Sequence, residues 1–172
     1  MAIVNYSEIL PELLVGACPA SAQEVQQLKQ LTGVSAALSL QTDADLHWLG
    51  LDWPELQGWY SAVGIQARRV PVRDGDTQDL RARLPACARA LDALLAQGHK
   101  VYLHCTAGVG RSPTVAIAWL VWRGRMQLEE ARAWVTQRRS CSPDMNALDA
   151  VLEENPFCQD LGGDLSAWSD PG

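Results

Sequence analysis

The sequence predicts a single α/β domain with a mostly parallel central sheet flanked by helices. Short apolar runs of strand length alternate with longer segments of helical periodicity, which is typical of parallel strands joined by crossover helices. The chain has 172 residues, of which 48% are hydrophobic, enough for one domain with an adequate core. We expect this domain to span residues 1–155, followed by a loosely held tail at residues 156–172.

Strands are expected where short apolar runs end at a turn or helix signal. Residues 34–40 form a buried run that directly follows a helix and a glycine. Residues 65–72 form a second apolar-rich run, and residues 100–103 form a third that leads into a tight turn. Because the carboxyl ends of parallel strands meet at one edge of a sheet, functional residues are sought directly after these runs.

Helices are expected where capping residues precede a periodic segment. Ser21 and Glu24 have the spacing of a capping box, Asp52 precedes a proline in a first turn, and Gly98 follows a long helical pattern as a stop signal. The predicted helices are residues 21–31, 54–63, 78–97, 111–123, 128–139 and 143–154.

Composition and charge exclude several classes of protein. The five cysteines are an odd number without a C-x-x-C pair, which argues against a disulfide scaffold or a zinc site and suits a reducing cytosol. The net charge of −6 argues against nucleic acid or an anionic membrane as the main partner. The longest apolar run, residues 115–122, is too short to cross a membrane, and no secretory signal begins the chain. We therefore expect a cytoplasmic monomer.

The most informative stretch is residues 104–112, His-Cys-Thr-Ala-Gly-Val-Gly-Arg-Ser, between a predicted strand and a predicted helix. The backbone N–H groups of such a loop can converge on one anion, and the helix N-terminus adds positive potential there. Residues 105–111 are called the anion loop below. Its inner residues are expected to bind a phosphate group through their backbone: Thr106, Ala107, Gly108, Val109 and Gly110.

Three side chains around this loop have complementary chemistry. A helix N-terminus and a nearby cation favour the thiolate form of a cysteine, so Cys105 is the candidate nucleophile. Arg111 presents a planar fork of donors that fits phosphate oxygens bidentately. Ser112 is placed to donate a hydrogen bond to the sulfur and so assist its departure. His104 is expected to order the loop by hydrogen bonding. For Cys105 there is a structural alternative, because a lone cysteine after a strand is more often a small buried hydrophobe.

The full stretch resembles the H-C-x-x-G-x-x-R-[ST] motif of the cysteine-dependent protein-tyrosine and dual-specificity phosphatases. That resemblance implies the dual-specificity phosphatase fold and a covalent cysteinyl-phosphate intermediate that water later hydrolyses. It also implies that the reaction needs no metal and no cofactor.

Such chemistry needs an acid that protonates the leaving oxygen. Asp74 lies 31 residues before Cys105, close to the separation usual in dual-specificity phosphatases, and is the first candidate. Asp76 remains an alternative, and Asp79 also lies nearby, although aspartates in these positions are often turn or cap residues. Residues 53–55, Trp-Pro-Glu, superficially resemble the acid loop of tyrosine phosphatases but are predicted to begin a helix.

Flanking segments narrow the resemblance to the plant glucan phosphatases of the starch-excess type and, more distantly, to laforin. Residues 73–85 resemble R-D-F-D…L-R-x-x-L-P, residues 40–48 resemble L-Q-x-D-x-D-[IM]-E-[YW], and residues 138–143 resemble K-R-S-C-x-P. Residues 14–16 fit the opening strand of that family. The resemblance implies a phosphorylated starch- or glycogen-like glucan as substrate, and Trp48 as a residue that contacts the sugar.

Two positions differ from the pattern of the plant enzymes. Gly75 stands where the plant enzymes carry Phe, and Leu49 stands where another aromatic residue is expected.

Five arginines near the predicted acid loop have two interpretations. They either steer an anionic substrate or form a solvated helix face with acidic neighbours: Arg68, Arg69, Arg73, Arg81 and Arg83. Of these, Arg73 is assigned to substrate binding.

The sequence is also compatible with two other functions. A protein phosphatase acting on phospho-Tyr, phospho-Ser or phospho-Thr would use the same loop, so a phosphoprotein is the alternative substrate. A phosphate- or glucan-binding module without turnover is the non-enzymatic alternative, although Cys105, Arg111 and Asp74 are all present.

Overall fold

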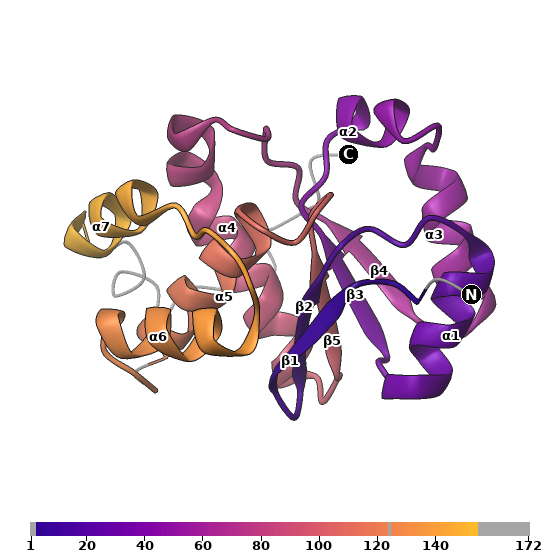
Figure 1. Ribbon diagram of the computed structural model, residues 1–172, viewed down its shortest axis with the longest axis horizontal. Helices are drawn as coiled ribbons and strands as arrows, with labels where there is room; N and C mark the ends of the chain where they lie inside the picture. Colours follow the sequence, from indigo (N-terminus) through magenta and orange to yellow (C-terminus); the bar gives the residue numbers. More distant parts are fainter. Residues whose placement is uncertain (1–2, 124, 155–172) are drawn as a thin grey trace.

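The computed structural model describes residues 3–123 and 125–154, which form a five-stranded sheet between two groups of helices (Figure 1). The strand order is β1-β2-β5-β3-β4, with β1 antiparallel to β2 and all other neighbours parallel. The predicted α/β class with a mostly parallel sheet is therefore confirmed. The strands are β1 (Tyr6–Leu10), β2 (Leu13–Gly16), β3 (Ala36–Ser39), β4 (Gln66–Arg69) and β5 (Val101–His104).

The helices cover the two faces of the sheet as separate groups. The first three pack with one hydrophobic cluster and the last four with another. On one face lie α1 (Ala22–Thr32), α2 (Asp43–Trp48) and α3 (Trp53–Ala62), and on the other α4 (Thr77–Ala96), α5 (Arg111–Trp122), α6 (Leu128–Arg138) and α7 (Met145–Glu154).

The central strand β5 joins the two clusters. All four of its residues are buried, and Val101 and Leu103 contact the cluster around α4–α7 whereas Tyr102 contacts the cluster around α1–α3. This alternation follows from the two-residue period of a strand. After β5 the chain enters α5, where every residue from 111 to 120 is buried because α4, α6 and α7 surround it. Both ends of the anion loop are thus anchored in the core.

The capping signals are formed in the structure. The Ser21 Oγ accepts a hydrogen bond from the Glu24 N–H, while the Glu24 carboxylate accepts from the N–H of Ala20, one residue before the cap. Asp52 Oδ1 accepts from the N–H of Glu55, with Pro54 in the first turn. Residues 53–55 therefore begin a helix as expected, and the six predicted helices lie within about two residues of their predicted bounds.

Two elements were not predicted, and one strand is shorter than expected. β1 is an edge strand in which only Ile9 is buried, so it lacks an apolar run. α2 has six residues, too few for a helical period to be recognised, although a complete capping box of Thr42 and Asp45 begins it. The strand predicted at residues 65–72 ends at Arg69. Two further hydrogen bonds, Val70 N to Ser39 O and Val72 N to Leu40 O, still hold that segment beside β3.

The predicted tail, residues 156–172, and the predicted domain boundary at residue 155 both lie outside the described residues. Within residues 3–123 and 125–154, no helix is both long and apolar enough to cross a membrane.

Gly16 ends β2 beside the strand that leads to the anion loop, and it has no space for a side chain. A Cβ there would lie 2.5 Å from the Asn5 carbonyl oxygen and would also collide with the Tyr102 hydroxyl. We predict that Gly16→Ala lowers the free energy of unfolding by about 1–3 kcal/mol. Gly58→Ala, inside α3 where a Cβ meets nothing within 4 Å, is expected to raise it by about 0.5–1 kcal/mol. Urea unfolding of both variants tests this, and a shift of the same sign in both would contradict it.

Candidate active site

The anion loop begins directly after β5 and ends in the first turn of α5. Cys105 is 3% exposed and Arg111 is 4% exposed, so both functional groups lie at the bottom of the loop. Gly108 turns the loop with a φ of +71°, a conformation that glycine adopts without strain. A Cβ at Gly108 would also lie 2.5 Å from the Gly16 carbonyl and from the Arg139 side chain. Backbone conformation and space both require glycine here.

The Cys105 sulfur lies among hydrogen-bond donors. The Gly108 N–H donates to Sγ over 3.3 Å, and the buried Ser112 hydroxyl lies 3.3 Å from the same atom. The N-terminus of α5 points into this space and stabilises negative charge there. The structure thus brings Cys105 and Ser112 together as the sequence predicted, and their catalytic roles remain predictions.

The carbonyl groups of the anion loop are all bonded on its outer side. Thr106 O accepts from Cys18 N, and Val109 O accepts from Ser142 N. Arg139 donates to two of the carbonyls, from Nη2 to Ala107 O and from Nε to Gly108 O. Gly110 O accepts from Thr114 Oγ1. By contrast, the N–H groups of Thr106, Ala107, Val109 and Gly110 donate to no acceptor in the described part of the chain. A peptide unit whose C=O points outward turns its N–H inward. This arrangement leaves a ring of donors for an anion.

Arg139 makes the largest contribution to this outer layer, and sequence reasoning missed its role. Its guanidinium group is buried and donates to Gly108 O over 2.6 Å, to Ala107 O over 3.2 Å and to Ser7 Oγ over 3.2 Å. The neighbouring Arg138 is exposed and stacks on the Trp134 ring. The resemblance at residues 138–143 marked this segment, but adjacent arginines in a sequence do not reveal which of them is buried.

Arg111 has one fixed edge and one edge directed toward the site. Its Nη1 donates to three acceptors, Asp45 Oδ2 over 2.7 Å, Val72 O over 2.8 Å and Leu40 O over 3.4 Å. The other edge makes only long contacts: Nη2 lies 3.4 Å from Thr106 Oγ1, and Nε lies 3.4 Å from Asp74 Oδ1 without hydrogen-bond geometry. A phosphoryl group can therefore take the Nε–Nη2 edge while Nη1 stays anchored.

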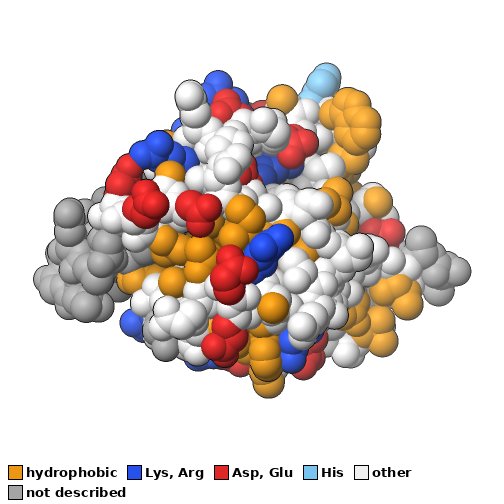
Figure 2. Space-filling view, turned by 60° about the vertical axis from the view of Figure 1, so that its left-hand side comes forward, with side chains coloured by type: hydrophobic (Ala, Val, Ile, Leu, Met, Phe, Trp, Pro, Cys, Tyr) orange, Lys and Arg blue, Asp and Glu red, His pale blue; other side chains and the backbone are white. Residues whose placement is uncertain are grey.

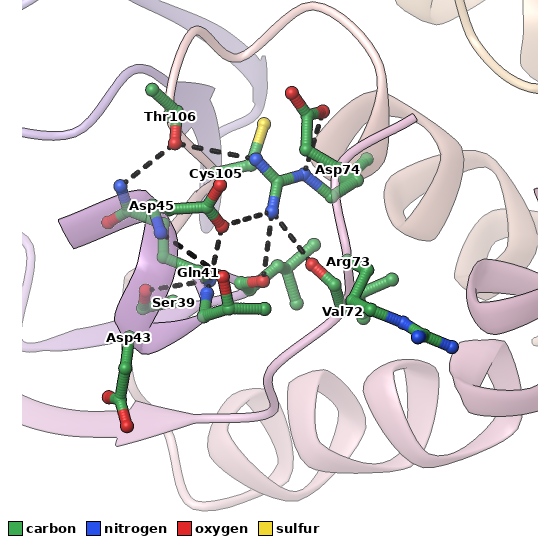
Figure 3. A network of polar contacts seen from close by, with 12 residues as sticks. Ser39, Gln41, Asp43, Asp45, Val72, Arg73, Asp74, Cys105 and Thr106 are labelled. Carbon is green, nitrogen blue, oxygen red and sulfur yellow. Dashed lines mark hydrogen bonds and ion pairs between the residues drawn. The ribbon is translucent and has the colours of Figure 1, made fainter. Parts of the chain in front are cut away.

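The three candidate acids occupy different environments. Asp76 caps α4 by accepting a hydrogen bond from the Asp79 N–H, and Asp79 in turn accepts from the Arg73 N–H and pairs with Arg83. Asp74 is 72% exposed and lies beside Arg111. Figure 3 shows Asp74 and Cys105 on the same side of the polar network. This geometry favours Asp74 over the other two, and its role as the acid stays a prediction.

The structure does not bring Arg73 into the site. Its guanidinium group lies 3.4 Å from Asp76 and 3.7 Å from Asp79, and in Figure 3 its side chain extends away from Cys105. The carboxylates at the start of α4 draw it to that side, and its assignment to substrate binding stays a prediction. Trp48, by contrast, is 80% exposed and ends α2, the helix from which Asp45 reaches Arg111.

Three of the other four arginines near the predicted acid loop pair with carboxylates. The pairs are Arg69 with Asp43, Arg81 with Glu154 and Arg83 with Asp79. In Figure 2, basic and acidic side chains adjoin one another on the face that carries α4 and α7, and no single basic patch forms there. The interpretation as a solvated face with acidic neighbours fits these residues better than steering of an anion.

His104 supports the loop from within the core. Its Nδ1 lies 3.1 Å from the Cys105 carbonyl oxygen, which can only accept, so Nδ1 donates. In the neutral ring Nε2 then accepts from the Tyr60 hydroxyl over 2.9 Å. Complete burial lowers the pKa of His104 to about 4. The residue is therefore neutral at physiological pH and orders the loop, as the sequence suggested.

No group of three or more His, Cys, Asp or Glu side chains is arranged to hold a metal ion in the part of the chain that the structure describes.

Comparison with known sequences gives one family. The chain matches the dual specificity phosphatase catalytic domain over residues 16–155. It is 37% identical over 153 residues to the amyloplastic phosphoglucan phosphatase DSP4 of Castanea sativa, covering 88% of this chain and 40% of that protein. It is 32% identical to laforin of Mus musculus, covering 79% and 44%, and 30% identical to dual specificity protein phosphatase 2 of Homo sapiens, covering 85% and 42%. The chain thus spans less than half the length of these relatives.

Solved structures give the same fold. PTPMT1 superposes with a TM-score of 0.70 at 24% identity, covering 90% of this chain and 94% of that chain. Human DUSP28 superposes with a TM-score of 0.67 at 24% identity, covering 92% and 97%. The dual-specificity phosphatase fold implied by the sequence is confirmed.

We predict that His104 makes the fold sensitive to acid. In the unfolded chain a histidine takes up its proton near pH 6.5, whereas folded His104 stays neutral down to about pH 4. The unfolded state therefore binds more protons in this window, and stability rises with pH across it, by about 3 kcal/mol for this group. Urea unfolding at several pH values should show a shallower dependence in His104→Asn. His47→Asn, at an exposed position, serves as the control, and equal slopes in wild type and His104→Asn would contradict the prediction.

Proposed function

The chain belongs to the dual-specificity phosphatase family, and we propose that it hydrolyses phosphate monoesters of a glucan through a thiol nucleophile. The observation that carries the catalytic part is the anion loop itself. Every carbonyl group from Thr106 to Gly110 is bonded on the outer side, so the ring of N–H groups, the Cys105 sulfur and the Nε–Nη2 edge of Arg111 surround one space.

The reaction proceeds in two displacements. The Cys105 thiolate attacks phosphorus, and the bond from phosphorus to the sugar oxygen breaks while Asp74 gives its proton to that oxygen. The loop N–H groups and Arg111 hold the phosphoryl oxygens as charge shifts among them. Water then attacks the cysteinyl-phosphate, its proton passes to the Asp74 carboxylate, and inorganic phosphate leaves. Ser112 donates a hydrogen bond to the sulfur as the thiolate is restored.

A glucan substrate is supported by Trp48 and by the relatives. Trp48 exposes a flat aromatic face at the end of a helix that contacts Arg111 through Asp45. Such a face can stack on a glucose ring, and one of the similar proteins is a phosphoglucan phosphatase. Because Arg73 pairs with the carboxylates of α4, Trp48 is the principal candidate for recognition beyond the phosphate.

A phosphoprotein is the second candidate, and two positions favour it. Gly75 has a φ of +70° and carries no side chain where the plant pattern has an aromatic wall, and Leu49 beside Trp48 is aliphatic. A protein phosphatase of the same family is 30% identical to this chain. The two candidates differ in what they require of Trp48, because a phosphorylated side chain needs no sugar platform.

The substrate is tested by phosphate release from phosphorylated amylopectin, divided by turnover of an aryl phosphate in the same preparation. Cys105→Ser is expected to abolish both activities. Trp48→Ala is expected to lower the glucan-to-aryl ratio about 3- to 10-fold, the energy of one aromatic stacking contact. Leu31→Ala removes another exposed apolar side chain, just before the amino end of β3 and thus at the opposite edge of the sheet, and should leave the ratio unchanged. A low ratio in the wild type with strong aryl turnover would move the substrate to phosphoproteins.

The acid is tested with two leaving groups. Asp74→Ala is expected to slow hydrolysis of an alkyl phosphate about 10²–10⁴-fold, and to slow an activated aryl phosphate much less, because only the poor leaving group needs a proton. Asp76→Ala removes the cap of α4 and should cost about 1 kcal/mol of stability with little loss of turnover. If Asp76→Ala alone produced the selective loss, the acid would be Asp76.

A further inference from the structure

The short helix α2 is attached to the bottom of the site through one carboxylate oxygen. Asp45 Oδ2 accepts a hydrogen bond from the Thr42 N–H over 2.8 Å and a second from Arg111 Nη1 over 2.7 Å. The Thr42 hydroxyl in turn accepts from the Asp45 N–H, which closes the capping box of the helix. The position of this carboxylate is therefore determined by the start of α2 as well as by the arginine.

Asp45 is the anionic anchor of a buried cation. Arg111 is 4% exposed, and its other Nη1 acceptors are the neutral carbonyls of Leu40 and Val72. Asp74, the second carboxylate beside it, is exposed, lacks hydrogen-bond geometry and faces the edge that receives substrate. A buried arginine that loses its anchoring carboxylate is left with uncompensated charge and an unfixed rotamer.

The charge state of Asp45 suits this arrangement. Burial alone would raise the pKa of the carboxyl group, but hydrogen bonds from Arg111 and Thr42 outweigh it and hold that pKa below its usual value. Asp45 is thus ionised wherever the enzyme is expected to work.

We propose that Asp45 is a positioning residue that fixes Arg111 by its Nη1 atom and so presents the Nε–Nη2 edge to the phosphoryl group. The inference rests on the proposed phosphatase function and deepens it. Asp45 does not itself touch the substrate. Without Asp45, the guanidinium group can rotate toward Asp74 and Thr106, the contacts that a phosphoryl group would otherwise replace.

The test uses inorganic phosphate as the probe, because phosphate occupies the loop without any sugar or peptide. We measure its inhibition constant against an aryl phosphate, together with KM and kcat. Asp45→Ala is expected to raise the inhibition constant and KM about 10- to 100-fold, as for loss of a hydrogen bond between charged groups. Asp45→Asn keeps an oxygen that can accept from Arg111, so it is expected to restore most of the affinity.

Asp43→Ala is the matched control. Asp43 lies in the same first turn of α2, is 87% exposed and pairs with Arg69, and Figure 3 shows it pointing away from Cys105. Its removal takes the same charge from the same helix terminus and should leave phosphate affinity unchanged. If Asp45→Ala does not fold, Asp45→Ser replaces it, since a serine hydroxyl is too short to reach Arg111.

Each other outcome overturns the inference. Equal losses in Asp43→Ala and Asp45→Ala would assign the effect to the charge of the helix terminus. An Asn variant as weak as the Ala variant would assign it to charge on Arg111 and not to position. Unchanged affinity in Asp45→Ala would show that the backbone carbonyls suffice. If wild-type protein neither hydrolyses the aryl phosphate nor binds phosphate, the proposed function itself fails, which is a separate result.

Discussion

The site depends on hydrogen bonds that lie outside it. A loop can offer a ring of N–H groups to an anion only if its carbonyl groups are satisfied elsewhere, because a buried unpaired carbonyl costs about as much as a lost hydrogen bond. Here that requirement is met by donors from three separate parts of the chain. Cys18 follows β2, Thr114 lies in α5, and Arg139 and Ser142 follow α6. The packing of the helical layer therefore determines the geometry of the anion site.

This dependence explains which parts of the site could be predicted from the sequence. The residues of the anion loop form one continuous motif, and their chemistry can be derived from their order alone. Arg139 lies 31 residues from Gly108 and Asp45 lies 66 residues from Arg111, and no local pattern encodes these contacts. The direction of Arg73 could not be predicted for the same reason: a positive charge beside the acid loop can pair toward the site or away from it, and in the structure it pairs with the carboxylates of α4.

The elements of the fold also divide into those that local signals predicted and those that they did not. Helices with strong caps and buried strands were predicted closely, since caps and apolar runs are local signals. The edge strand β1 and the short helix α2 were not predicted, because an edge strand needs few apolar residues and a helix of six residues shows no period. Both elements contribute to the site: β1 supplies Ser7 to Arg139, and α2 supplies Asp45 to Arg111.

The two ends of α2 have different surroundings, and this difference affects how such proteins can diversify. Asp45 and the buried Leu46 hold the helix against the arginine and the core, whereas His47, Trp48 and Leu49 face solvent. Replacement of the outer three residues exchanges the surface offered to a substrate while the inner contacts stay intact. A lineage could in this way move between polymers, peptides and small esters by changing one short segment, with the hydrolytic centre inherited unaltered.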